Sequence, residues 1–182
     1  MTQNYDINRG KIMKKRNLKK MTLAALFAAI AVVGSLFSVP VLGSKCAPVQ
    51  HLINIMGAVF LGPGWALGVA FVASLIRNLL GLGTLLAFPG SMCGALLAGV
   101  LYKAFKKLPF AYVGELVGTG LIGGMLSYPV AVWFLHSETA ALFTFVIPFL
   151  ISSAGGTLLA AIATIAMAKS GVLEKFKKEL EA

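Results

Sequence analysis

The stretch ASLIRNLLGLGTLLAFPGSMCG, residues 73–94, sets the organisation of this chain. It is an apolar run that carries one arginine and one asparagine side by side, followed by a glycine-rich break and a second apolar run that opens on Pro-Gly-Ser. The pattern predicts two membrane helices joined by a loop. Arg77 would then lie inside a bilayer, where a charge is costly unless it faces a polar cavity or a partner. The stretch therefore predicts a site as well as a fold.

The composition places the chain in the class of integral membrane proteins. Hydrophobic residues make up 58% of the 182 residues and charged residues 12%, whereas soluble domains are about 45–50% apolar and about 25% charged. The net charge of +10 could suggest nucleic acid. However, the basic residues adjoin apolar runs and do not form a stripe interleaved with aromatics. We therefore expect a lipid membrane, and no nucleic acid, as the partner of the basic residues.

Six apolar runs predict an all-α protein of six transmembrane helices. The second run is short for a bilayer span and is expected to be tilted or partly internal. The chain divides into a basic N-terminal segment (1–20), a six-helix membrane domain (21–169) and a C-terminal tail (170–182). The predicted helices cover residues 21–39, 49–61, 65–80, 89–105, 110–135 and 141–168.

The basic residues predict the orientation. All 16 except Lys45 and Arg77 lie within 9–20, 103–107 or 169–178. These three segments fall on one side of a six-helix topology, and clustered lysine and arginine mark the cytoplasmic side. Both termini are therefore expected in the cytoplasm.

Polar and aromatic residues are expected to converge in the outer half of the membrane. A mostly apolar pocket with a few polar groups suits a small organic ligand. Alternative roles stay open: His51 and Trp133 could be interface anchors, the two asparagines could bond neighbouring helices, and Arg77 could extend to the membrane surface. The candidate binding residues are His51, Asn54, Arg77, Asn78, Phe88, Ser91, Tyr128 and Trp133.

Catalytic and metal-binding patterns are lacking in the sequence. His51 is predicted near the outer end of its helix and Glu115 near the inner end of another, about a membrane apart, so that Glu115 is expected to be structural. There is no GxSxG, HExxH or CxxC motif, and no cofactor is expected. Cys46 and Cys93 could pair, but two buried small side chains are the simpler interpretation. A GxxxxGK[ST] loop is also missing, so a self-sufficient ATP-driven pump is excluded. A small channel or an intramembrane enzyme remains an alternative.

The first predicted helix carries two pairs of alanines at a spacing of four. Ala24 with Ala28, and Ala25 with Ala29, leave a flat strip on which another helix can approach closely. The same alanines could instead pack inside the bundle. The residues alone leave both interpretations open.

Three segments of the chain carry a resemblance to a known family. The segments are PVQHLINIMGAVFLGPGWAL (48–67), SLIRNLLGLGTLLAFPGSMCGALLAG (74–99) and GELVGTGLIGGMLSYPVA (114–131). They resemble the substrate-binding S component of energy-coupling factor (ECF) vitamin transporters, in particular the ThiW type assigned to the thiamine precursor hydroxyethylthiazole. The resemblance covers residues from about 19 to 168.

The resemblance implies a prokaryotic plasma-membrane protein with a ligand occluded near the outer face, under the loop between helices one and two. It also implies docking on a transmembrane T component and two ATPase subunits through an Ala-x-x-x-Ala motif on helix one, which the two alanine pairs match. A neutral thiazole could stack on Phe88, Tyr128 or Trp133. For such a ligand Arg77 is surplus, and it could order the loop or indicate an anionic precursor. Another vitamin, thiamine itself or a pyrimidine precursor stays an alternative ligand.

Overall fold

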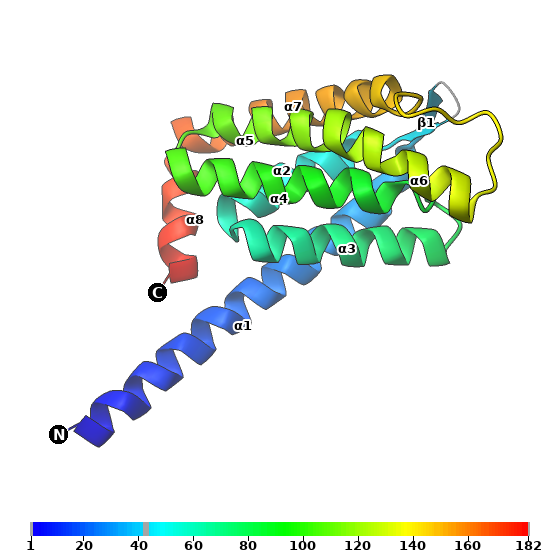
Figure 1. The fold of residues 1–182 in the computed structure, drawn as a ribbon. Coiled ribbons are helices and arrows are strands. Elements are labelled where there is room, and N and C mark those ends of the chain that lie inside the picture. The colour runs from blue at the N-terminus through cyan, green and yellow to red at the C-terminus, as the bar shows by residue number, and fades with distance from the viewer. Residues whose placement is uncertain (1, 42–43, 182) are drawn as a thin grey trace.

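The computed structural model describes residues 2–41 and 44–181, with the side chains of residues 2–12, 14 and 44 outside the description. Helices dominate the described part of the chain, and α5, the π-helix and α6 run on as one helix (Figure 1). The elements are α1 (Thr2–Gly34), a 3-10 turn (Ser35–Phe37), β1 (Val39–Val41), β2 (Ser44–Cys46), α2 (Pro48–Phe60), α3 (Pro63–Leu79), α4 (Ala87–Phe105), α5 (Leu108–Glu115), a π-helix (Leu116–Gly123), α6 (Gly124–Phe134), α7 (Val146–Lys169) and α8 (Val172–Glu181).

The bundle consists of six helical passes that alternate in direction, and both ends of the chain lie at the same end of it (Figure 1). Four passes are long and apolar enough to cross a membrane: Lys15–Phe37, α4, Leu108–Phe134 and α7. The other two, α2 and α3, have 13 and 17 residues. The protein is thus a multi-pass helical membrane protein, and the second pass is short, as expected.

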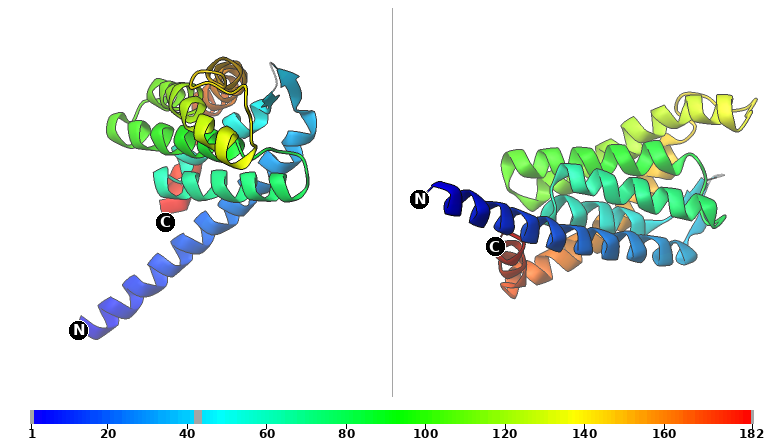
Figure 2. Two further views of the ribbon diagram at one scale, coloured as in Figure 1. Left: turned by 45° about the vertical axis from the view of Figure 1, so that its right-hand side comes forward. Right: turned by 90° about the horizontal axis from the view of Figure 1, so that it is seen from below.

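The basic N-terminal segment does not precede the first helix but forms part of it. The sequence predicts a helix from residue 21, whereas α1 begins at Thr2 and extends well beyond the bundle (Figure 2). Lysine, arginine, leucine and methionine are good helix formers, and proline is missing from 2–34. Helix-forming residues therefore extend α1 on the N-terminal side of its apolar part.

A short β-hairpin corrects the all-α prediction. β1 and β2 pair antiparallel, with Val39 opposite Cys46 and Val41 opposite the residue at 44, and the hairpin lies at the end of the bundle opposite the termini (Figure 1). Strands of three residues are too short to show an alternating pattern in the sequence. Pro40 is tolerated because a two-stranded ribbon has free edges.

The last long helix also begins later than predicted. α7 begins at Val146 and not near Ala141. Ala141 and Thr144 close a turn instead: the backbone N–H of Ala141 donates to Thr144 Oγ1 at 2.8 Å, and the N–H of Thr144 donates to the Ala141 carbonyl at 3.0 Å. Threonine side chains often compete in this way with helical hydrogen bonds.

Glycine contacts bring α4 and the helix of 108–134 together backbone to backbone. A Cβ on Gly114 would stand 2.6 Å from Ala98 Cα, one on Gly118 would stand 2.8 Å from Gly94 Cα, and one on Gly123 would stand 2.6 Å from Gly90 Cα. The three partners on α4 are spaced by four residues, but Gly118 and Gly123 are five apart. The π-helix spans that step, because its wider turn takes up the additional residue. The glycines of this helix therefore let its backbone lie directly against that of α4.

The C-terminal tail folds back as α8. Leu173 and Leu180 are buried in the main core cluster, and the Lys177 ammonium donates hydrogen bonds to the Tyr102 hydroxyl and to Glu174. Partial burial alone would lower the pKa of Lys177, but these two hydrogen bonds outweigh it and raise the pKa above its ordinary value. Lys177 is therefore charged at neutral pH and fastens α8 to α4.

The glycine contacts predict the effect of a methyl group. Gly118→Ala would place a Cβ 2.6 Å from the Cys93 carbonyl oxygen, so α4 and the π-helix must separate, at a cost of about 1–3 kcal/mol. Gly68→Ala is the matched control, because nothing lies within 4 Å of a Cβ there and alanine favours a helix by about 1 kcal/mol. Thermal unfolding in detergent should show a lower midpoint for Gly118→Ala and an equal or higher one for Gly68→Ala. Equal midpoints for Gly118→Ala and the unmutated protein would refute close packing at this contact.

Candidate functional site

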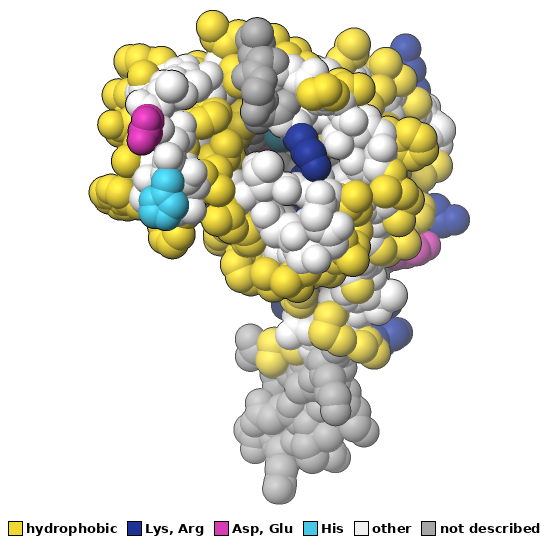
Figure 3. Space-filling model, turned by 90° about the vertical axis from the view of Figure 1, so that its right-hand side faces the viewer, with side chains coloured by type: hydrophobic (Ala, Val, Ile, Leu, Met, Phe, Trp, Pro, Cys, Tyr) yellow, Lys and Arg dark blue, Asp and Glu magenta, His cyan; other side chains and the backbone are white. Residues whose placement is uncertain are grey.

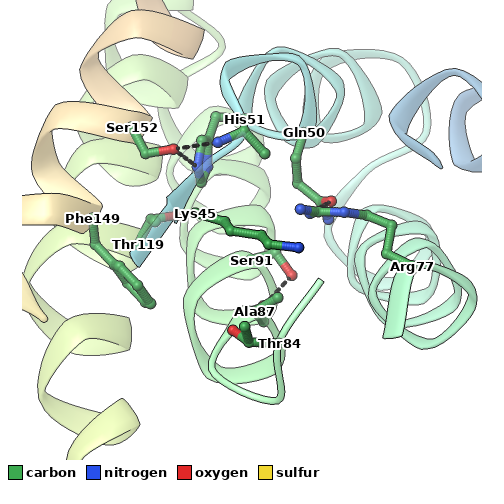
Figure 4. Close-up of a pocket in the computed structure, with 11 residues that line it drawn as sticks. Lys45, Gln50, His51, Arg77, Thr84, Ala87, Ser91, Thr119, Phe149 and Ser152 are labelled. Atoms are coloured by element: carbon green, nitrogen blue, oxygen red, sulfur yellow. Dashed lines mark hydrogen bonds between the residues drawn. The ribbon is translucent and has the colours of Figure 1, made fainter. Parts of the chain in front are cut away.

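A small cavity of about 40 Å³ lies beneath the hairpin. Seen from this end the surface is largely apolar and uncharged, and a basic side chain stands over a hollow near its centre (Figure 3). Most of the residues around the cavity come from the helix ends nearest the hairpin, as the close-up shows (Figure 4). The lining residues are Lys45, Ala47, Gln50, His51, Arg77, Thr84, Ala87, Ser91, Thr119, Phe149 and Ser152.

The geometry follows from where the helices begin and end. Gln50 and His51 lie in the first turn of α2, which begins at Pro48, a residue suited to the first turn because it has no N–H to leave unpaired. Arg77 lies in the last turn of α3. Phe149 lies in the first turns of α7, and its ring packs where Gly90 of α4 leaves room, because a Cβ on Gly90 would come within 2.8 Å of the ring.

A buried carboxylate organises one side of the cavity. Glu115 is fully buried, and its Oε1 accepts hydrogen bonds from Thr119 Oγ1 at 2.8 Å and from Asn54 Nδ2 at 3.0 Å. His51 Nδ1 lies 2.8 Å from the same oxygen. One carboxylate oxygen thus joins α2 to the helix of 108–134 inside the bundle.

Hydrogen bonds hold both ring nitrogens of His51. Ser152 Oγ accepts from the backbone N–H of Ala47 at 3.0 Å and lies 3.0 Å from His51 Nε2. Since an ionised carboxylate only accepts, the hydrogen of the His51–Glu115 contact is on Nδ1. The chain from Ala47 through Ser152 and His51 to Glu115 ties the hairpin strand to the interior of the bundle.

This contact overturns the prediction that His51 and Glu115 lie a membrane apart. Measured from the end of the bundle that holds the termini, Glu115 is seven residues from the start of α5 and His51 is nine residues from the end of α2. At 1.5 Å per residue the two depths are about 10 and about 14 Å. The prediction failed because it took the start of the short α2 to be at the outer surface, whereas α2 begins inside the bundle under the hairpin.

Arg77 faces Gln50 on the other side of the cavity. Both side chains are buried, with 3% and 2% of their surfaces exposed, and the Arg77 guanidinium donates to the Gln50 amide oxygen. Asn78, the next residue, donates to the carbonyls of Ser74 at 2.8 Å and Thr84 at 3.0 Å. Asn78 therefore holds the α3–α4 loop, and Arg77 is left to face the cavity.

Several buried polar atoms near the cavity have no hydrogen-bond partner among the described residues. Two are donors, Gln50 Nε2 and Arg77 Nε, and two are acceptors, Asn54 Oδ1 and Glu115 Oε2. An unpaired buried polar group costs about 1–3 kcal/mol. Such groups around a single cavity are typical of a binding site for a small polar molecule.

Comparison with known families decides the identity. A family model described as "Thiamine-precursor transporter protein (ThiW)" matches residues 21–170. The chain belongs to the ThiW family. It is therefore a transporter and not an enzyme. Neither the curated proteins nor the solved structures contain a match to the chain.

In this ThiW family member, three of the eight candidate binding residues line the cavity: His51, Arg77 and Ser91. Asn54 lies directly behind it, bonded to Glu115 and to the Ser91 carbonyl. Phe88 packs against Phe71, with ring centroids 5.7 Å apart.

The remaining candidates lie away from the cavity. Asn78 binds the loop, Tyr128 is half-buried, and Trp133 is 72% exposed. The lining residues that the sequence analysis did not select include Gln50, Thr119, Phe149 and Ser152. Two features of the sequence could have identified them. Thr119 follows Glu115 at the i, i+4 spacing of one helix face, and polar residues occur in the first turns of the helices that begin near the hairpin.

The arrangement is suited to binding. Cys46 and Cys93 are free thiols, and within residues 2–41 and 44–181 no group of histidine, cysteine and acidic side chains could hold a metal ion. What the site offers is an aromatic ring, hydroxyls, amides and one buried cation.

The Glu115 network predicts a large stability effect. Glu115→Ala removes the acceptor of three side chains and leaves their donors unpaired in the interior, which should lower the free energy of unfolding by about 3 kcal/mol or more. Glu138→Ala, at an exposed loop position, should change it by about 0.5 kcal/mol or less. The two variants can be compared by thermal unfolding in one detergent, and similar midpoints would contradict the role of Glu115.

Proposed function

We propose that this ThiW family member is the substrate-binding component of an ECF-type importer that captures hydroxyethylthiazole outside the cell and delivers it with an ATPase module. The observation that carries the proposal is a cavity lined by an aromatic ring, several hydroxyls and two residues with unpaired buried donors, Gln50 and Arg77. Hydroxyethylthiazole combines a flat ring, a ring nitrogen that accepts a hydrogen bond and a hydroxyl that both donates and accepts. Phe149 would stack on the ring, Gln50 Nε2 would donate to the nitrogen, and the Thr119 hydroxyl, which lines the cavity, would accept from the ligand hydroxyl.

Entry of this ligand requires the cover to move. A cavity of about 40 Å³ has room for a few water molecules and not for a thiazole ring. The hairpin is anchored at one end, where the Ala47 N–H donates to Ser152, whereas the contact of Lys45 with the Gly81 carbonyl is exposed and measures 3.3 Å. In the proposed cycle the hairpin lifts, the ring enters beside Phe149, and the hairpin closes over it.

The charge distribution supports an outward-facing cavity. The lysines of 103–107, 169–178 and the basic part of α1 gather at the end where both termini lie (Figure 1), and such clusters favour the cytoplasmic side. The six passes would then cross a prokaryotic plasma membrane with the hairpin outside.

One of the two alanine pairs on α1 is available to a partner. Ala25 and Ala29 are exposed, whereas Ala24 is half-buried and Ala28 is 6% exposed within the core. The exposed pair lies among Met21, Leu26, Ile30 and Val33, which are exposed apolar residues. We infer that this strip docks on the T component, which with two ATPase subunits would supply the ATP hydrolysis for which this chain has no phosphate loop.

Ligand binding tests the proposed pocket. Phe149→Ala should weaken binding of hydroxyethylthiazole at least about tenfold by removing the stacking surface, while Trp133→Ala, whose ring lies 72% exposed, should leave the affinity unchanged. Native mass spectrometry and calorimetry on the detergent-purified protein would measure both. If Trp133→Ala weakened ligand binding more than Phe149→Ala, the ligand would bind near Trp133, and the proposed location of the pocket would be wrong. Failure to bind hydroxyethylthiazole, thiamine and a pyrimidine precursor alike would overturn the proposed capture of a thiamine precursor by this pocket.

Docking can be tested independently of ligand binding. Ala25→Trp should abolish co-purification with a T component and the ATPases, because a large ring prevents close helix contact, and ligand binding should persist. Leu158→Trp is the control, since Leu158 is 64% exposed on α7, away from the α1 strip. Equal recovery of the complex with both variants would refute docking through Ala25 and Ala29.

A further inference from the structure

The cavity contains a buried cation without an anionic partner. Arg77 is 3% exposed, its guanidinium donates to the neutral amide of Gln50, and its Nε is unpaired. The ion pairs within the described chain are His51–Glu115 and Lys177–Glu174, so no described carboxylate lies within 4.0 Å of Arg77. An arginine guanidinium keeps its positive charge in a protein interior.

A second cation lines the same cavity. Lys45, on β2, is exposed, and its described hydrogen bond is the one to the Gly81 carbonyl at 3.3 Å. Figure 4 shows its ammonium group directed across the cavity toward the side where Gln50 and Arg77 lie. Two positive groups therefore face one small space.

The carboxylate of Glu115 lies on the side of the cavity opposite Arg77. Glu115 Oε1 is engaged by His51, Asn54 and Thr119, and Figure 4 places His51 and Thr119 across the cavity from Arg77. Arg77 and Lys45 outnumber Glu115, so the site carries a net positive charge. A buried charge without a counterion is unfavourable, and an arginine fork that is partly unpaired matches two oxygens of one oxyanion.

The hydrogen-bond donors on the Arg77 side add to this match. The unpaired Nε2 of Gln50 is a donor, and the hydroxyl of Thr84 also lines the cavity. An ammonium, a guanidinium, an amide and a hydroxyl together form a donor set for an anion and exceed what a neutral alcohol can accept.

We propose that the natural ligand carries an oxyanion, a phosphate monoester or a carboxylate, which Arg77 and Lys45 bind while its ring lies toward Phe149. This inference rests on the proposed function, because it specifies the chemical class of the ligand in the same pocket. Binding would replace the contact of Lys45 with Gly81 by a stronger one to the ligand, so the anion itself would draw the hairpin closed.

The test compares matched ligands on the full chain in detergent. Calorimetry would measure hydroxyethylthiazole, its phosphate ester and a methylthiazole carboxylate. The wild type should bind at least one of the two anions with an affinity at least about tenfold higher than its affinity for the alcohol. Added salt should lower the affinity for the anion and leave that for the alcohol unchanged. Whichever anion is preferred identifies the oxyanion.

Variants connect the preference to the two cations. Arg77→Met should abolish the preference for the anion, Arg77→Lys should retain part of it, and Lys45→Met should reduce it at least about threefold. Lys107→Met, which removes an exposed charge at the other end of the bundle, should leave it unchanged. Since Lys45 is exposed on the hairpin, its variant can be measured even if Arg77→Met does not fold.

The outcomes separate the two proposals. Wild-type protein that binds the alcohol as tightly as both anions would overturn the oxyanion inference and leave the transport proposal intact. An anion preference that is undiminished in Lys45→Met, or that Arg77→Met leaves in place, would also overturn it. Binding of none of the three ligands would overturn both proposals.

Discussion

The carboxylate of Glu115 is the contact on which the interior of this protein depends. One oxygen of this carboxylate accepts from α2 twice and from its own helix once. A single missing donor would leave charge unpaired in the interior, so these elements have one favourable relative position. Through His51 and Ser152 the same network extends to the first residue after the hairpin. The cover of the cavity and the core of the bundle are therefore one hydrogen-bonded unit.

The two sides of the cavity differ in kind. On the Glu115 side one carboxylate oxygen is held by three donors, and the atoms left unpaired are acceptors, Asn54 Oδ1 and Glu115 Oε2. On the Arg77 side a guanidinium, an amide and an ammonium have fewer partners than they can take. Rigid groups hold the shape of a binding site, and unsatisfied groups supply its affinity. This division is what is expected of a protein that must bind a small molecule and then release it.

Much of the fold was predictable because glycine and proline punctuate the sequence. The second to fourth helices were expected at 49–61, 65–80 and 89–105 and are found at 48–60, 63–79 and 87–105, since Pro48, Pro63 and the glycines of 81–83 allow few other boundaries. The hairpin was missed because its strands are three residues long. Of the residues selected from the sequence, His51, Arg77 and Ser91 line the cavity, whereas Glu115 was misplaced. Its depth depends on where a short helix begins within the bundle, which hydropathy alone does not encode.

The π-helix determines which side of α6 faces the rest of the bundle. The segment 116–123 carries one residue more than the spacing of its partners on α4 requires. If that residue were wound into an ordinary α-helix, the chain beyond it would rotate by about 100°. Ser127, which now donates to the Leu86 carbonyl and to Gly123, would then turn away from α4, and lipid-facing leucines would take its place. The wide turn thus corrects the rotation of the helix about its axis. Because of it, Glu115 in the first half faces the interior and Ser127 in the second half also faces the interior.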